Sequence, residues 1–230
     1  MTLRLYQSWC SNPVASGMCG FGQIKSKSIQ GNMLKIGITG GIGVGKTVVT
    51  RVFALLGVPV YDSDARAKWV MHHNEVLRQE LLSVYGQETF TSSGELNRTY
   101  LASQVFNNPQ KLAQLNSLVH PHVRNDFKVW ADAHADKAYV LKEAALMYES
   151  EAWKQMDQII TVYAPMEVRI KRLLLRDTHR TEADIKAIIE KQMSEEDKIS
   201  RAQHVVYNDD KQFIIPQVLK LHEQFLSGKA

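Results

Sequence analysis

The sequence predicts an α/β fold built on a five-stranded parallel sheet flanked by helices. Five short apolar segments alternate with segments of helical periodicity, the pattern in which crossover helices cover both faces of a parallel sheet. The expected strands are residues 34–39, 58–62, 138–141, 158–163 and 204–207. Residues 65–135 have helical periodicity and no convincing strand, which predicts a helical insertion on the sheet.

The first expected strand leads directly into a glycine-rich loop. The loop consists of Gly40, Gly41, Ile42, Gly43, Val44, Gly45, Lys46 and Thr47, which fit the pattern G-x-x-x-x-G-K-[ST]. The pattern requires a preceding strand and a following helix, here expected over residues 48–56 and closed by Gly57. Its glycines let successive N–H groups point into one concavity beside the positive end of that helix. The loop predicts nucleotide binding, with Lys46 on the terminal phosphates and the Thr47 hydroxyl on Mg²⁺. The alternative is a glycine-rich turn that only begins a helix.

Asparagines and prolines mark helix boundaries within the insertion. Asn97 can cap a helix, and Asn108-Pro109 gives a cap followed by a proline in the first turn. His120-Pro121 repeats this arrangement and predicts a further helix start. A histidine in that place is more often a locally bonded cap than a catalyst.

The segments around the last two strands also carry helix signals. A helix is expected from Pro165 to about Arg176, and Thr181 with Asp184 forms a capping-box pattern. The closing helix near residues 211–226 has an apolar face made of Ile214, Val218, Leu221 and Phe225. The polar segment at about 177–200 fits a lid that closes over ATP and excludes water.

The composition is typical of a soluble globular protein with one domain. The chain has 230 residues, of which 44% are hydrophobic and 23% charged. No apolar stretch approaches the roughly 20 residues that span a bilayer, so we expect no membrane partner. Three of the four net positive charges come from residues 1–32, whereas residues 33–230 hold 25 basic and 24 acidic side chains. The near-neutral charge of residues 33–230 argues against a nucleic-acid partner.

Residues 1–32 are expected to be a disordered extension. They hold both cysteines, Cys10 and Cys19, and polar residues interrupt the apolar core that a signal peptide needs. Because the rest of the chain has no cysteine, neither a disulfide framework nor a Cys-based zinc site can hold the fold, which suits the reducing cytoplasm. We hypothesise that this segment is dispensable, as an upstream mis-started translation before Met33. Loss of ATP binding in a protein begun at Met33 would contradict this.

Two carboxylates follow the second expected strand. Ligands of open α/β sheets bind beyond the carboxyl ends of the strands, so Asp62 and Asp64 should face the same crevice as the phosphate loop. Asp64 can accept the proton of a substrate hydroxyl or orient that hydroxyl toward the γ-phosphate. The alternative is that Asp64 or Ser63 only caps a helix starting at residue 65.

Two arginines lie four residues apart on the helix expected after the fourth strand. Like charges at that spacing oppose helix formation, and a triphosphate would remove the conflict between Arg172 and Arg176. Their guanidinium groups would then stabilise the transferring phosphoryl group. The alternative is a solvated basic face balanced by Glu167 and Asp177.

Taken together, these motifs resemble the dephospho-coenzyme A kinase family over essentially all of residues 33–230. The matching segments are, in order, Ile36–Lys46, Asp62-x-Asp64, Gly94-x-Leu96-x-Arg98-x-x-Leu101 with Val105-Phe106, Leu118-x-His120-Pro121, Leu146-Met147-Tyr148-Glu149, and Arg172-x-x-x-Arg176-Asp177 with Gln192. Each segment other than the phosphate loop is weak alone, but their order and spacing are specific.

The resemblance implies a P-loop kinase core with a helical CoA-binding insertion at about 65–135 and a lid. It implies transfer of the γ-phosphate of ATP, with Mg²⁺, to the ribose 3′-hydroxyl of dephospho-CoA. The implied catalytic residues are Lys46, Asp64, Arg172 and Arg176. Nucleotide binding falls to the loop through Val48, with Asn208 near the adenine, and acceptor binding to Asp62, Arg98, His120 and Glu149.

Other classes of protein remain open at this point. Another small-molecule or nucleotide kinase could use the same core, and acceptor screening distinguishes it. A GTPase-like switch needs an N-K-x-D motif, and Asn208-Asp209-Asp210-Lys211 has the wrong order. A basic nucleic-acid-binding ATPase is disfavoured by the near-neutral charge of residues 33–230. The sequence leaves the oligomeric state open.

Overall fold

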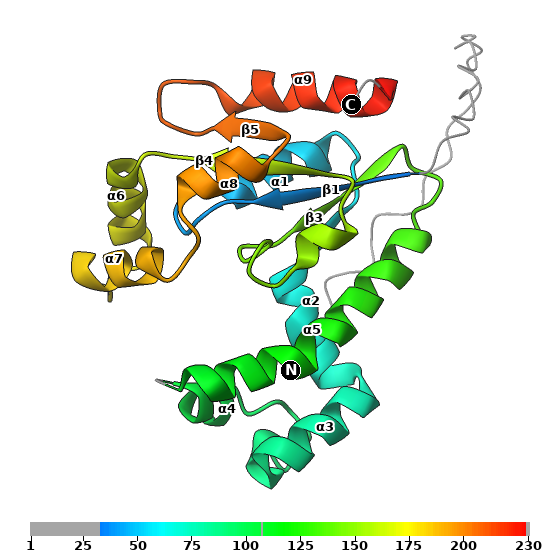
Figure 1. Cartoon of the computed structure of the whole chain (residues 1–230), viewed down its shortest axis with the longest axis vertical. Helices are drawn as coiled ribbons and strands as arrows, with labels where there is room; N and C mark the ends of the chain where they lie inside the picture. Colours follow the sequence, from blue (N-terminus) through cyan, green and yellow to red (C-terminus); the bar gives the residue numbers. More distant parts are fainter. Residues whose placement is uncertain (1–32, 107, 229–230) are drawn as a thin grey trace, which may run out of the picture. The chain divides into compact units, whose positions relative to one another are not determined.

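Five parallel strands form the sheet, as the sequence predicts. The computed structural model describes residues 33–106 and 108–228, so the predictions for residues 1–32 lie outside the described residues. The strands are β1 (Leu34–Thr39), β2 (Val60–Asp62), β3 (Tyr139–Glu143), β4 (Gln158–Tyr163) and β5 (His204–Tyr207), in the spatial order β2-β3-β1-β4-β5 (Figure 1). All four neighbouring pairs are parallel. The chain leaves β1 between strands from both halves of the sheet, where open α/β folds bind ligands.

One face of the sheet packs against the first and last helices. Helices α1 (Lys46–Leu55) and α9 (Ile214–Ser227) share an apolar core with β1, β3 and β4. Ile36 and Ile38 of β1 are fully buried in this core. Gly37, between them, faces the opposite side, where a Cβ would stand 3.0 Å from Met156 and 3.1 Å from Met147. This alternation is the period of two that a strand buried on both faces shows.

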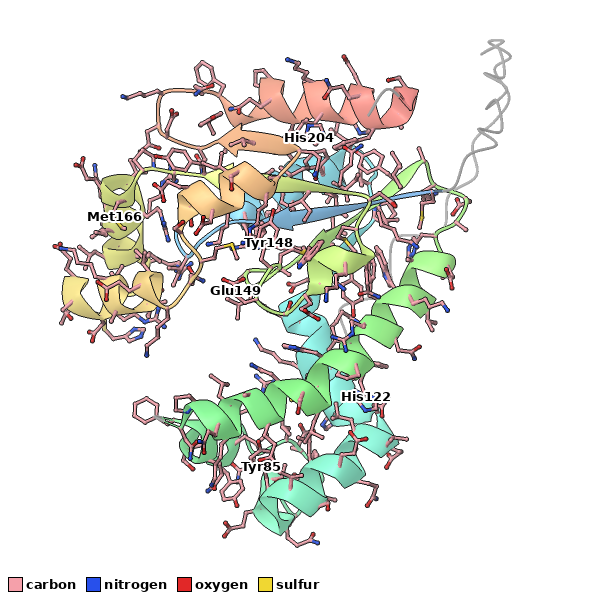
Figure 2. All side chains as sticks on the ribbon, viewed as in Figure 1. Tyr85, His122, Tyr148, Glu149, Met166 and His204 are labelled. Carbon is pink, nitrogen blue, oxygen red and sulfur yellow. The ribbon has the colours of Figure 1, made fainter. Side chains whose placement is uncertain are left out.

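The segment between β2 and β3 is helical, as predicted. It contains α2 (Ser63–His73), α3 (Glu75–Tyr85), the short 3₁₀ helix η1 (Gln87–Thr89), α4 (Arg98–Val105) and α5 (Pro109–Asp132). These helices lie on the β2–β3 side of the sheet (Figure 1). Polar contacts join them: the Tyr85 hydroxyl donates to the Lys111 carbonyl at 2.9 Å, and His122 lies 3.1 Å from Glu80 (Figure 2).

Tyr61 of β2 connects the sheet edge to the core of the insertion. Its ring packs edge-on against Phe127 of α5 at 5.1 Å, and its hydroxyl donates to Asp126 at 2.6 Å. Burial, together with that hydrogen bond, raises the pKa of Tyr61. The strand that carries Asp62 is therefore held by the same side chain that anchors α5.

Asparagine caps begin the helices of the insertion. Asn97 accepts from the N–H of Tyr100 at 3.1 Å, and Asn108 accepts from that of Lys111 at 3.0 Å, which confirms both predicted caps. Asn74 caps α3 in the same way.

The predicted helix start at His120-Pro121 is wrong. Helix α5 continues through Pro121 to Asp132, and its ribbon changes direction part-way along its length (Figure 1). Val119, Val123 and Phe127 continue one buried face across the proline. This packing outweighs the backbone hydrogen bond that proline removes.

The chain after β3 returns to the sheet through short helices. They are η2 (Ala152–Gln155), α6 (Met166–Arg176), α7 (Glu182–Glu190) and α8 (Glu195–Arg201). Thr181 and Asp184 form the predicted capping box of α7. Helix α8 was not expected from the sequence. Across the described ranges 33–106 and 108–228, none of the helices combines the length and apolar character needed to cross a bilayer.

Candidate active site

The glycine-rich loop joins β1 to α1 and takes the strand–loop–helix form that the sequence predicts. Gly45 is the N-cap of α1, with φ +88°, and no side chain caps the helix there. The N–H of Val48 donates to the Gly45 carbonyl at 3.0 Å, so the N–H groups of Lys46 and Thr47 before it are the ones left for a ligand. Asn208, after β5, donates its amide to the Val44 carbonyl at 2.7 Å, and a Cβ on Gly45 would collide with that amide. Glycine is required here both for its backbone angle and for the space.

Lys46 lies in this loop and bonds to it. Its Nζ donates to the Gly40 carbonyl at 2.9 Å. Burial lowers the pKa of Lys46, and the nearby charges of Glu143 and Asp64 oppose that fall. Thr47 follows on the exposed first turn of α1, and Val48 is half exposed beside it.

A cavity of about 340 Å³ opens over the loop. Its lining includes Gly43, Gly45, Lys46 and Thr47 from the loop, Arg172 and Arg176 from α6, and Gln192. The structure therefore brings both predicted arginines to the phosphate loop. Asn208 reaches the same place through its bond to Val44.

The two arginines are bonded differently. Arg172 donates to Asn208 at 3.1 Å and to Asp210 at 2.5 Å, while its Nη1 is buried without a partner. Arg176 forms a two-point pair with Asp177, at 2.8 and 2.9 Å. The alternative interpretation of these arginines was half right, because Asp177 does pair with Arg176. The acid that pairs with Arg172, however, is Asp210 and not Glu167.

A buried ion network, not expected from the sequence, supports the loop. Arg169 of α6 donates Nε to the Ile42 carbonyl at 2.9 Å, and its Nη1 lies 3.3 Å from Glu195 of α8. Lys198 lies 3.1 Å from the same Glu195 oxygen. A Cβ on Gly41 would collide with Arg169 and Glu195. No local sequence signal pairs residues on separate helices with a loop more than 120 positions away.

Two further contacts join the segment between α7 and α8 to the loops that follow β1 and β3. The Gln192 side chain accepts from the N–H of Ile42 at 2.9 Å. Glu149, on the loop after β3 (Figure 2), accepts from the N–H of Met193 at 3.0 Å. Glu149 is thus held by the segment between α7 and α8 and lines neither of the cavities around the loop and Asp64.

The two aspartates after β2 have different roles in the local structure. Asp62 caps α2, accepting from the N–H of Ala65 at 2.9 Å. The proposed capping by Asp64 or Ser63 is therefore wrong, because α2 begins at Ser63, two residues earlier than expected. Asp64 lies in the first turn, and its carboxylate lines a separate cavity.

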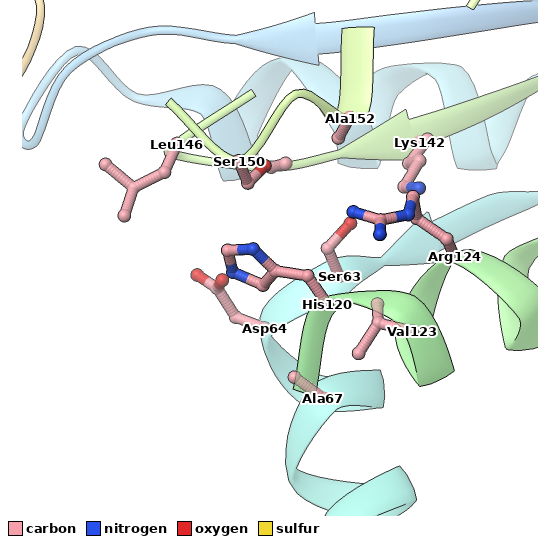
Figure 3. Close-up of a pocket in the computed structure, with 11 residues that line it drawn as sticks. Ser63, Asp64, Ala67, His120, Val123, Arg124, Lys142, Leu146, Ser150 and Ala152 are labelled. Carbon is pink, nitrogen blue, oxygen red and sulfur yellow. The ribbon is translucent and has the colours of Figure 1, made fainter. Parts of the chain in front are cut away.

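That second cavity, of about 110 Å³, brings α2, α5 and the end of β3 together (Figure 3). His120 lines it with Asp64, so the structure brings together these two sequence-predicted residues. Burial lowers the pKa of His120, and the charge of Arg124 acts in the same direction. His120 lies within α5 and does not cap a helix.

Glu143, at the carboxyl end of β3, was not predicted as a site residue. It accepts from the Thr50 hydroxyl at 3.1 Å. Burial raises the pKa of Glu143, Lys46 opposes the rise, and the like charges of Asp62 and Asp64 add to it. The expected strand at 138–141 ended before this residue, so its place beside Lys46 was not foreseen.

Arg98 lies apart from these residues. It lines a cavity of about 380 Å³ with Lys68, Trp69 and His72, on another side of α2. The structure therefore does not bring Arg98 into the cavity of Asp64 and His120, although α2 borders both. Its role in acceptor binding stays a prediction.

Comparison with known proteins decides the family. A family model described as dephospho-CoA kinase matches residues 34–213. The chain belongs to the dephospho-CoA kinase family. It is 41% identical to a dephospho-CoA kinase from Bacteroides fragilis strain YCH46 over 188 residues, which is 82% of this chain and 91% of that one. It is 36% identical to a dephospho-CoA kinase from Porphyromonas gingivalis strain W83, covering 83% and 94%.

Two solved structures share the fold. TT1252 from Thermus thermophilus is 30% identical, with a TM-score of 0.72 and coverage of 85% of this chain and 99% of that one. Dephospho-CoA kinase from Campylobacter jejuni superposes with a TM-score of 0.65 at 21% identity, covering 85% and 98%. The chain is thus a kinase with the P-loop α/β fold that the sequence predicts.

Proposed function

We propose that this protein transfers the γ-phosphoryl group of ATP to the ribose 3′-hydroxyl of dephospho-CoA, giving CoA and ADP in the last step of CoA biosynthesis. Family membership supports the substrates. The observation that carries the site assignment is the closeness of Asp64 to Lys46: Asp64 lines one cavity, Lys46 lines the other, and the charge of Asp64 acts on Lys46. Donor and acceptor would meet between them.

The phosphate loop and α6 would hold the donor. The N–H groups at the start of α1 and the Lys46 ammonium would bind the phosphates, drawing Lys46 away from the Gly40 carbonyl. Arg172 has an unpartnered buried Nη1 to offer to the developing charge, whereas Arg176 is committed to Asp177.

The residues at the carboxyl ends of β2 and β3 fit a magnesium ion carried by ATP. Thr47 offers a hydroxyl, and Glu143 offers a carboxylate on which the like charges of Asp62 and Asp64 act. Within residues 33–106 and 108–228, no three His, Cys, Asp or Glu side chains form a metal site on their own. The phosphates of ATP and water would supply the remaining ligands. Mg²⁺ would neutralise the charge that develops on them.

Asp64 would position the acceptor. Its carboxylate can accept the 3′-hydroxyl proton and aim the oxygen at the γ-phosphate, and His120 borders the same space. We propose that the segment at about 177–200 closes over ATP, because Gln192 and Glu195 both touch the loop. We further propose that the enzyme acts in the cytoplasm, on small molecules and not on nucleic acids or membranes.

The test is an acceptor screen with Mg·ATP. ADP release should respond to dephospho-CoA and hardly at all to nucleosides, AMP or shikimate, and mass spectrometry should find CoA as the product. Lys46→Ala should lose turnover with every acceptor. ADP release that is independent of dephospho-CoA would contradict the proposal.

A further inference from the structure

The cavity that holds Asp64 and His120 contains more cationic than anionic groups. Its lining includes one carboxylate, Asp64, against Arg124 and Lys142 (Figure 3). Neither cation is paired with a carboxylate within 4.0 Å among the ion pairs of the described ranges. Asp126, whose charge acts on Lys142, is already bound by Arg66 at 2.9 Å and by the Tyr61 hydroxyl at 2.6 Å.

Lys142 is unusual because it is buried without a counter-ion. Its side chain is 1% exposed, in a strand that is otherwise apolar up to that point. Its Nζ donates to Gln155 at 3.1 Å and lies 4.1 Å from the centre of the Phe127 ring. An ammonium has three donors, so the known contacts leave room for an anionic ligand. A buried charge without a partner is costly, which makes a purely structural role a poor explanation.

Ser63 and Arg124 add donors to the same end of the cavity. The Ser63 hydroxyl is buried without a hydrogen-bond partner and lines the cavity. The Arg124 carbonyl accepts from the amide of Gln155, the same residue that accepts from Lys142. Figure 3 shows the side chains of Ser63, Arg124 and Lys142 directed toward one another, with Asp64 and His120 farther along the cavity.

We infer that Ser63, Arg124 and Lys142 bind the diphosphate group of the acceptor, while Asp64 holds its 3′-hydroxyl at the other end of the cavity. This inference rests on the proposed function. The acceptor carries its negative charge on that diphosphate, and two cations with a free hydroxyl match it. The cavity is small, about 110 Å³, so only part of the acceptor would enter it. The subsite would make the enzyme select acceptors by charge as well as by the hydroxyl.

The first test compares two acceptors, each with Mg·ATP. Adenosine has the same ribose 3′-hydroxyl but no diphosphate. Lys142→Met should lower kcat/KM for dephospho-CoA by about ten- to a hundred-fold, the range of a charge-assisted hydrogen bond, and leave kcat/KM for adenosine within about two-fold. Arg124→Gln, on a partly exposed side chain, should show the same split and guards against misfolding of the first variant. Lys128→Met, exposed on α5, is the matched control and should change neither.

A second test does not depend on adenosine turnover. Inorganic diphosphate offers the same anion without the ribose, so at saturating Mg·ATP it should compete with dephospho-CoA in steady-state kinetics. Lys142→Met should raise its inhibition constant about ten- to a hundred-fold, and Lys128→Met should leave it unchanged. Equal losses with both acceptors, or an unchanged inhibition constant in Lys142→Met, would overturn the inference. Failure of wild-type enzyme to phosphorylate dephospho-CoA would instead overturn the proposed function.

Discussion

The side-chain oxygen of Gln192 accepts the backbone N–H of Ile42 at 2.9 Å, so the segment between α7 and α8 is bonded directly to the phosphate loop. Arg169 donates to the carbonyl of the same residue. The backbone N–H and C=O of Ile42 are therefore both bonded to side chains. The tip of the loop is thereby fixed by residues that the chain supplies far downstream.

Replacing Gln192 by methionine should loosen the loop without changing its charge. One hydrogen bond contributes about 0.5–1.5 kcal/mol, so we expect the ATP dissociation constant to rise about two- to ten-fold, measured by calorimetry. Gln114→Met, at an exposed glutamine of α5, is the control. Unchanged ATP affinity in Gln192→Met would show that the bond does not shape the loop.

Replacing Asp64 by asparagine should affect turnover far more than ATP binding. Loss of a group that accepts the hydroxyl proton typically costs about 10²–10⁴ in rate, so kcat should fall in that range while the ATP dissociation constant stays within two-fold. Asp132→Asn, at the exposed end of α5, is the control. Equal loss of kcat in both variants would remove the role given to Asp64.

Replacing Arg172 and Arg176 of α6 by glutamine, one at a time, should separate their contributions. We expect Arg172→Gln to lower kcat about 10²–10³-fold, the size seen when a donor to a transition-state charge is removed. Arg176→Gln should lose less than about ten-fold, because that guanidinium is paired with Asp177. Steady-state kinetics measure which of the two variants loses more kcat. Asp210→Asn, which frees Arg172 from its partner, should retain activity.

Gly45→Ala and Gly57→Ala share one source of strain and differ in another. Both residues have positive φ, +88° and +83°, but only at Gly45 would the new methyl group meet a neighbour, the Asn208 amide. We expect Gly45→Ala to abolish ATP binding in calorimetry and Gly57→Ala to preserve it. Similar ATP affinity in the two variants would mean that Asn208 yields easily.

The burial of Lys142 should appear in the pH dependence of stability. Its pKa is about 8 in the folded state against 10.5 ordinarily, so the unfolded chain binds more protons between those values. The free energy of unfolding should therefore rise with pH in this window, by at most about 1.4 kcal/mol per unit from this group. Urea unfolding of wild type and Lys142→Met at pH 8.0 and 9.5 checks this, since the rise should be smaller in the variant. Measurements stay below pH 10 because the raised pKa of Tyr61 reverses the trend there.

The sequence predicts three of the five strands with their observed bounds. Residues 34–39, 158–163 and 204–207 agree with β1, β4 and β5. The third strand extends beyond its expected end because Lys142 is buried despite its charge. Helix α9 begins later than expected, because Asp209 accepts from the N–H groups of Lys211 and Gln212 in a turn. These departures depend on tertiary contacts that no local pattern contains.

In the candidate site too, some residues follow from a local sequence pattern and others depend on tertiary contacts. The phosphate loop was predictable because its function is local to eight residues, and the Asp62–Asp64 pair because it follows a strand. The aspartate that caps α2 depends on where the helix begins. The expected start at residue 65 is two residues later than the observed start at Ser63. Glu143, Arg169 and Lys142 were missed because their positions depend on packing between distant segments. The one signal that could have revealed Lys142 is a charged residue in an apolar strand.

Tyr61 has a consequence for how this enzyme should fail on heating. Its ring belongs to the hydrophobic cluster of the insertion, and its backbone to the strand that leads into Asp64. Melting of α5 would therefore release Asp64, the acid that we propose to orient the acceptor. Thermal inactivation and the loss of near-ultraviolet circular dichroism should then follow a single curve, with no inactive state that keeps its aromatic packing.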